Sequence, residues 1–242
     1  MLDIKQIESF YPENLRHFKR NILREYIQYK ILEIIYNSPF GKNLVFMGGT
    51  AVHIIHGSRR FSEDLDFDNI SMTETQFKEA CILIKERLQL EGLHLELKTI
   101  IKNAFHCYIK IPGMLYENRI SPLEKEKLTI RLDTEPQNFE YTPERKIINK
   151  FDVFQKINTV PAEILLAQKI ACIFTRKRTM GRDFFDIVTL SAGTEPDMRY
   201  LNEKLQIKNK ADLKEKLQNK CRQLNFEQLT EDLRPFIYEE TD

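Results

Sequence analysis

The chain has 242 residues, of which 42% are hydrophobic and 30% are charged, and its formal net charge is +1. This composition is typical of a globular protein, and the near-zero net charge excludes a polycation that coats nucleic acid or lipid with its whole surface. Any polyanionic partner must therefore bind to a local patch.

The first predicted elements are a helix over residues 12–37 and a short apolar strand over residues 43–47. Gly48 and Gly49 follow this strand and are expected to end it. A short helix, closed by Gly57, comes next. A glycine turn is therefore expected to join the strand directly to a helix.

The segment EDLDFD, residues 63–68, alternates acidic and apolar side chains, which is typical of a half-buried strand. An amphipathic helix is predicted after Thr73, because Gln76 stands three residues later in a capping-box spacing and Gly92 follows the helix end. Further strands are predicted at 93–101, 104–111 and 126–133, and loops with short strands extend to about residue 160.

From Pro161 onward the pattern is helical. Helices are predicted at 161–178, 182–191, 197–206, 209–222 and 225–238. The sequence therefore predicts an α+β fold: a mixed sheet with flanking helices over residues 1–158, and an all-α part over residues 159–242.

Three acids lie on alternate positions of the predicted strand. Asp64, Asp66 and Asp68 are expected on one face, because successive side chains of a strand point to opposite sides. Carboxylates this close repel each other unless a cation lies between them. Mg²⁺ suits this role, since it takes oxygen ligands and combines one or two carboxylates with substrate phosphates. Exposed aspartates on an edge strand are also common, so a solvated strand face remains an alternative.

A second strand, KLTIRLD, places Thr129, Arg131 and Asp133 on one face. If the two strands are neighbours, Asp133 joins Asp64 and Asp66. Three carboxylates around a pair of Mg²⁺ or Mn²⁺ ions form a site for in-line phosphoryl transfer. The backbone amides of the Gly-Gly-Thr turn, together with Ser62, are candidates for binding triphosphate oxygens.

The segment ILLAQKIACIF places Lys169 in the middle of an apolar helix, where a buried ammonium requires an anion. Arg176 lies seven residues later on the same face. Nine Lys or Arg residues stand against three acids over 144–182, an excess that would attract a polyphosphate or RNA. The alternatives are a Lys169 ammonium that reaches water, a solvated helix end at Arg176, and a first-turn helix acid at Asp183.

Two segments resemble a known family when they are taken together. The strand, Gly-Gly-Thr, the short helix and RFSEDLDF (residues 60–67) resemble the first motif of the nucleotidyltransferase superfamily, in particular its abortive-infection toxin branch of the AbiEii/AbiGii type. LLAQKIACIFTRKRTMGRDFFDI (residues 165–187) resembles the downstream lysine helix and Arg-Asp-x-x-Asp segment of that branch. The resemblance covers roughly residues 44–190.

The resemblance implies roles for individual residues. Asp64 and Asp66 become metal ligands, Ser62 a phosphate contact, Lys169 the triphosphate-binding lysine, and Asp183 a further catalytic acid. The other candidate nucleotide-binding residues are Gly48, Gly49, Thr50, Arg60 and Arg176. Asp133 is assigned as the third metal ligand by its position in the strand pattern, not by a motif.

The resemblance also implies an activity. It is the metal-dependent transfer of a nucleoside monophosphate from an NTP to an acceptor, in that branch an RNA and notably the 3′ end of tRNA, by a toxin paired with an antitoxin protein. One alternative is a nucleotidyltransferase that modifies a protein or a small molecule. Another is a catalytically degenerate domain that binds nucleotide without turnover.

The cysteines and the N-terminus bear on the expected location. Cys81, Cys107, Cys172 and Cys221 show no C-x-x-C spacing, so we interpret them as reduced thiols of a cytoplasmic protein. The N-terminus has no basic segment followed by an apolar one, so no signal peptide is expected. No apolar run approaches the ~18 residues of a membrane span, so no membrane partner is expected.

Overall fold

The computed structural model describes residues 1–102 and 104–238. The chain divides into two compact units, each discontinuous in sequence. The sheet unit comprises Met1–Thr50, Ser62–Asn138 and Pro143–Thr159, and the helical unit comprises Ala51–Phe61, Phe139–Thr142 and Val160–Asp242. The single boundary near residue 158 stays a prediction.

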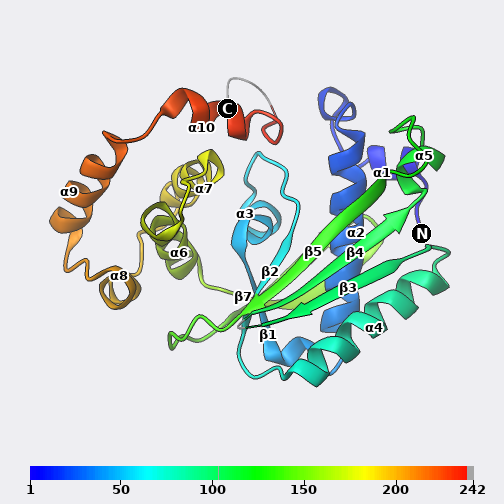
Figure 1. The fold of residues 1–242 in the computed structure, drawn as a ribbon, viewed down its shortest axis with the longest axis horizontal. Helices are drawn as coiled ribbons and strands as arrows, with labels where there is room; N and C mark the ends of the chain where they lie inside the picture. Colours follow the sequence, from blue (N-terminus) through cyan, green and yellow to red (C-terminus); the bar gives the residue numbers. More distant parts are fainter. Residues whose placement is uncertain (103, 239–242) are drawn as a thin grey trace. The chain divides into compact units, whose positions relative to one another are not determined.

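The sheet unit is built on a seven-stranded sheet with the order β3-β4-β5-β2-β1-β7-β6 (Figure 1). The β1–β7 and β2–β5 pairs are parallel and the other pairs are antiparallel, so the sheet is mixed. The strands are β1 (Leu44–Met47), β2 (Leu65–Asn69), β3 (Glu96–Ile101), β4 (Phe105–Pro112), β5 (Lys127–Glu135), β6 (Glu144–Lys150) and β7 (Val153–Thr159).

Helices cover the apolar side of this sheet. The two long ones, α2 (Lys19–Tyr36) and α4 (Glu74–Leu90), contact each other; α2 packs on β5 and β7, and α4 packs on β3 and β4. Thr73 and Gln76 form the predicted capping box at the start of α4. The short elements are α1 (Ile4–Glu8), η1 (Glu13–Leu15), η2 (Gly41–Asn43) and α5 (Met114–Glu117), and α3 (Gly48–His56) follows β1 directly.

The two sides of the sheet differ in polarity, as β5 shows. Leu128, Ile130 and Leu132 are fully buried, whereas Arg131 and Asp133 between and after them are only half-buried. We call the side that carries Arg131 and Asp133 the open side. The alternation of the sequence therefore assigns each side chain of β5 to the core or to the open side.

The helical unit contains α6 (Ala162–Thr175), α7 (Gly181–Ser191), α8 (Met198–Leu205), α9 (Lys210–Cys221) and α10 (Phe226–Leu233). The helix α6 packs against α7 and α8, and α7 packs against α10. A Cβ atom on Gly181 would lie 2.0 Å from the backbone oxygen of Leu229. Gly181 therefore permits the close approach of α7 and α10.

The predicted fold class is confirmed, and several element predictions need correction. The helix predicted over 161–178 ends at Thr175, because Arg176 adopts an extended backbone conformation, and the helix predicted over 225–238 ends at Leu233. The long N-terminal helix begins at Lys19, not near residue 12, because Pro12 opens a separate 3₁₀ turn and Phe18 precedes α2. The region between residues 134 and 160 contains a regular hairpin of seven-residue strands, β6 and β7, in place of loops with short strands. No helix among the described residues has the length and apolar character needed to cross a membrane.

Candidate active site

The turn between β1 and α3 is built around one carboxylate. Gly48 has φ +76°, a conformation that favours glycine, and a Cβ atom there would lie 2.1 Å from Oδ2 of Asp66. Asp66 pairs with Met47, the last residue of β1. A glycine at position 48 therefore lets the Asp66 carboxylate lie against the backbone of the turn.

Replacing this glycine should be costly. Gly48→Ala is expected to lower the free energy of unfolding by about 1–3 kcal/mol, because it adds left-handed backbone strain and forces the Asp66 carboxylate to move. Urea unfolding followed by circular dichroism measures this. Gly92→Ala is the matched control, since Gly92 has φ +92° but open space around its Cβ position. Equal losses in the two variants would contradict the role given to the Asp66 contact.

The structure brings the predicted acids of β2 and β5 together on the open side. The sequence left open whether the two strands are neighbours. In the structure they are parallel neighbours, and Asp66 and Asp133 are register partners. Asp64 lies just before β2. Arg131 forms ion pairs with both Asp64 and Asp133: its Nη2 lies 2.9 Å from Oδ2 of Asp64, and its Nε lies 2.7 Å from Oδ2 of Asp133. A side-chain cation therefore lies between two of the three carboxylates.

Arg131 was not among the residues singled out from the sequence. Burial alone would lower its pKa, but Asp64 and Asp133 raise it above the usual arginine range. His106 of β4 also lies beside Asp133, with 2.7 Å between Nδ1 and Oδ1. The signal was present in the strand pattern, because Arg131 shares the face of Asp133 two residues away.

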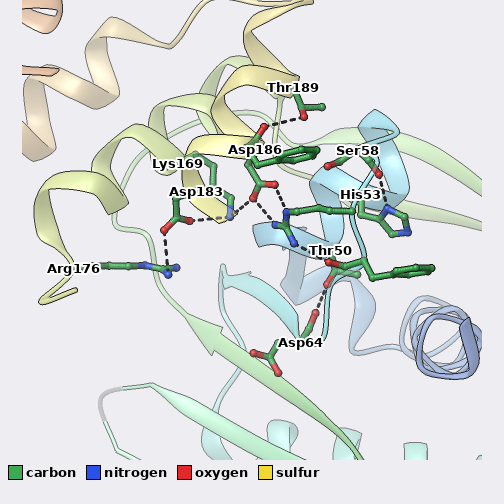
Figure 2. A network of polar contacts seen from close by, with 12 residues as sticks. Thr50, His53, Ser58, Asp64, Lys169, Arg176, Asp183, Asp186 and Thr189 are labelled. Carbon is green, nitrogen blue, oxygen red and sulfur yellow. Dashed lines mark hydrogen bonds and ion pairs between the residues drawn. The ribbon is translucent and has the colours of Figure 1, made fainter. Parts of the chain in front are cut away.

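Two further candidates of the sheet unit take part in backbone contacts. Thr50 is buried in α3, and its hydroxyl donates to the backbone oxygen of Asp64 (Figure 2). The backbone oxygen of Ser62 accepts a hydrogen bond from Nε2 of Gln28 at 3.1 Å. Gly49 lies in the first turn of α3. These contacts fix the chain that leads into β2, and the phosphate-binding roles of these residues stay predictions.

The helical unit holds a buried network of charges (Figure 2). Lys169 of α6 has its Nζ 2.7 Å from Oδ2 of Asp186 and 3.4 Å from Oδ1 of Asp183, both on α7. Arg60 donates from Nε and Nη2 to the two Asp186 oxygens, each at 2.7 Å. Nη1 of Arg176 lies 3.2 Å from Oδ2 of Asp183. Three cations therefore share two carboxylates, which leaves the network with one excess positive charge.

Burial and charge act in opposite directions on this network. Burial alone would raise the pKa of Asp186, but Lys169 and Arg60 hold it below its usual value. Burial alone would lower the pKa of Lys169, but Asp186 and Asp183 raise it. Both side chains therefore remain charged at neutral pH.

The network decides between two interpretations of Lys169. Its side chain is 8% exposed and is paired with Asp183 and Asp186, so the alternative of an ammonium in water is wrong. Asp186 also stands four residues after Arg182, a spacing at which two helix residues can pair. In the structure Asp186 pairs with Lys169 and Arg60, and the Arg182 guanidinium lies over the ring of Phe236. The nucleotide-binding roles of Lys169, Arg60 and Arg176 and the catalytic role of Asp183 stay predictions.

A family profile described as "Nucleotidyl transferase AbiEii toxin, Type IV TA system" matches residues 30–240. The chain belongs to this family. The AbiEii chain is therefore a nucleotidyltransferase of the toxin-antitoxin type, and its family implies a nucleotide substrate and an antitoxin partner. No curated protein matches the sequence.

Three solved structures share the fold of this AbiEii chain. JHP933 from Helicobacter pylori is 19% identical with a TM-score of 0.52, and the alignment covers 88% of this chain and 78% of that one. A putative nucleotidyltransferase from H. pylori is 18% identical, with a TM-score of 0.53 and coverage of 92% and 82%. An antigenic nucleotidyltransferase-like protein from Paracoccidioides brasiliensis is 16% identical, with a TM-score of 0.51 and coverage of 88% and 94%.

The donor set on the open side can be compared with the needs of a divalent metal. Within residues 1–102 and 104–238, no group of three or more His, Cys, Asp or Glu side chains is arranged to hold a metal ion. The chemistry of the acids nevertheless fits a hard cation, since Asp66 and Asp133 offer carboxylate oxygens from neighbouring strands. Asp64 is linked to Asp133 by Arg131, which forms an ion pair with each of them. Arg131 shows that this cluster attracts positive charge.

Proposed function

We propose that this AbiEii-family enzyme moves a nucleoside monophosphate from an NTP to an RNA acceptor, the 3′ end of tRNA. The observation that carries the proposal is the placement of Asp66 and Asp133 as register partners on parallel strands, with Asp64 joined to the same cluster by Arg131. Clustered carboxylates beside a glycine turn suit the binding of Mg²⁺ or Mn²⁺ with substrate phosphates.

Each group of the chain has a defined task in this proposal. Asp64, Asp66 and Asp133 would hold the divalent metal, and that metal would supply positive charge for the triphosphate and lower the pKa of the acceptor hydroxyl. Arg131 bridges two of these carboxylates, Asp64 and Asp133. The family resemblance assigns triphosphate binding to Lys169 and the role of a further catalytic acid to Asp183.

One experiment tests the function and its alternatives. The protein is incubated with each labelled NTP, Mg²⁺ and total tRNA, and a gel separates labelled RNA from labelled protein. We expect label on RNA from at least one NTP, and none after chelation of the metal. Label on protein or on a small product instead of RNA would favour a nucleotidyltransferase that modifies a protein or a small molecule. Nucleotide binding without any transfer would favour a degenerate domain.

Arg176 offers a test of triphosphate contact that spares the core. Its side chain is 43% exposed and pairs with Asp183 at 3.2 Å. Arg176→Gln should weaken NTP binding by about 10- to 150-fold, the equivalent of ~1.5–3 kcal/mol for hydrogen bonds to a charged group. Isothermal titration calorimetry measures the affinity. The matched control is Arg178→Gln, which removes an exposed arginine paired with Asp232. Equal affinities of the Arg176 variant and the parent would contradict the assignment.

A further inference from the structure

The open side of the sheet continues beyond the acids onto β4 and β3. Arg131 of β5 is the register partner of Tyr108 on β4, and Tyr108 is the partner of Lys98 on β3. Side chains of register partners lie on the same side of a sheet. The strands thus align a guanidinium, an aromatic ring and an ammonium in one row that starts at the carboxylates.

A neighbouring row adds another cation. Thr129 on β5 pairs with Lys110 on β4, two residues from Tyr108 on the same side. Lys98 is exposed and Lys110 is half-buried, and within the described part of the chain neither makes an ion pair at 4 Å or less. Figure 1 shows β3, β4 and β5 running side by side. We call Lys98, Tyr108 and Lys110 the platform.

We propose that the platform binds the single-stranded end of the RNA acceptor, with a base stacked on Tyr108 and backbone phosphates on Lys98 and Lys110. The inference rests on the proposed function and names the surface that receives its acceptor. Tyr108 is half-buried and lies between these cations. An aromatic ring flanked by cations is an arrangement by which proteins hold single strands, since every base offers a face for stacking and every phosphate a charge.

The spacing favours a polynucleotide over a single nucleotide. Neighbouring strands lie about 4.8 Å apart, so Lys98 on β3 lies roughly 10 Å from the strand that carries Asp133. The proposed function places the triphosphate of the NTP at the carboxylates. Lys110 and Lys98 lie one and two strands further away, so the anions that bind them would be additional phosphates of a polynucleotide. A duplex end fits less well, because its bases are already stacked on each other.

Another aromatic residue on the open side, which is more exposed than Tyr108, supplies a control. Phe154 of β7 is 69% exposed and stands two residues from the exposed Lys156 on the same side. Phe154 lies five residues before Thr159, the register partner of Phe46, and thus about 17 Å along the strand from it. Phe154 therefore has similar chemistry but lies at the other end of the sheet from the acids.

The test measures RNA binding without catalysis. Fluorescence anisotropy follows a labelled short single-stranded RNA, its blunt duplex, and tRNA, in EDTA and without NTP. Tyr108→Leu keeps an apolar side chain on the strand but removes the ring, and it should weaken single-strand binding by roughly 5- to 150-fold. Tyr108→Phe should restore the parent affinity, and Phe154→Leu should leave it unchanged.

Charge is tested separately through the salt dependence. Lys98→Gln combined with Lys110→Gln should reduce the slope of log affinity against log salt by about 1.4, or ~0.7 for each single-strand phosphate that no longer binds a lysine. Lys156→Gln should leave the slope as it is. NTP affinity, measured by calorimetry, should be the same in the parent, the double lysine variant and Tyr108→Leu.

The outcomes separate the platform from the proposed function. Parent-like RNA binding in the Tyr108→Leu and double lysine variants would overturn the platform and leave the RNA acceptor standing. Loss of affinity in the Phe154 control alone would place the RNA on β7 instead. Weaker NTP binding with unchanged RNA binding would assign Tyr108 to the nucleotide and also overturn the proposal. A parent protein that binds no RNA at all would refute the RNA acceptor itself.

Discussion

The Asp66→Asn enzyme should transfer nucleotide about 1,000-fold more slowly than the parent, while its fold remains intact. A metal contributes several kcal/mol of transition-state stabilisation, and each ~1.4 kcal/mol is a factor of ten in rate. Asparagine has nearly the shape of aspartate and fits against Gly48 in the same space. Asp66 is the better choice than Asp64 or Asp133, because each of those two forms an ion pair with Arg131. A substitution at either of them would also remove an ion-pair partner of the Arg131 guanidinium.

The measurement combines rate and folding. Transfer of label from NTP is compared at equal protein concentration, and circular dichroism spectra and melting temperatures show whether the variant is folded. Glu135→Gln is the control, since it neutralises an exposed acid on the same side of β5, two residues beyond Asp133. A folded Asp66→Asn protein with the parent rate would remove Asp66 from the site, and equal losses in both variants would point to a general effect of charge.

The sequence predicts local features of this fold well, because alternation and turn chemistry act over a few residues. Most of the DLDFD segment lies in β2 (Leu65–Asn69), with Leu65 and Phe67 in the core and Asp66 on the other side. The capping residues Thr73 and Gln76 mark the start of α4 correctly. Where a pattern repeats within one element, the sequence therefore specifies both the element and the side that each residue occupies.

Contacts between distant segments were harder to predict. The alternation of the sequence placed Asp133 on the open side of β5. Only the strand register shows that Asp133 lies beside Asp66 of β2. The apolar helix around Lys169 predicted burial and an anionic partner, yet that anion is not a substrate group in the structure but Asp186. Arg60 and Asp186 are 126 residues apart, and no local pattern links them. The same arginine belongs to a segment that resembles a nucleotide-binding motif, so the motif alone did not reveal its structural contact.

Asp186→Asn should destabilise the protein by about 3–5 kcal/mol, because it leaves two buried cations without a shared carboxylate. Arg60 is 2% exposed and Lys169 8%, so neither gains water in exchange. For a chain of this size, each kcal/mol shifts the melting temperature by about 2–4 °C, which gives a decrease of roughly 6–20 °C. Thermal unfolding followed by circular dichroism near neutral pH measures this shift.

The pH dependence provides an independent check on the same network. The pKa of Asp186 is lowered in the folded protein from 3.8, so its contribution to stability is present above about pH 3.8 and is lost as the pH falls through the folded value. The gap in melting temperature between parent and Asp186→Asn should therefore stay constant from neutral pH down to about pH 4 and narrow below it. Asp232→Asn breaks only the exposed pair with Arg178 and should shift melting by a few degrees at most. Similar melting temperatures for the Asp186 and Asp232 variants would mean that the buried charges contribute no more than a surface pair.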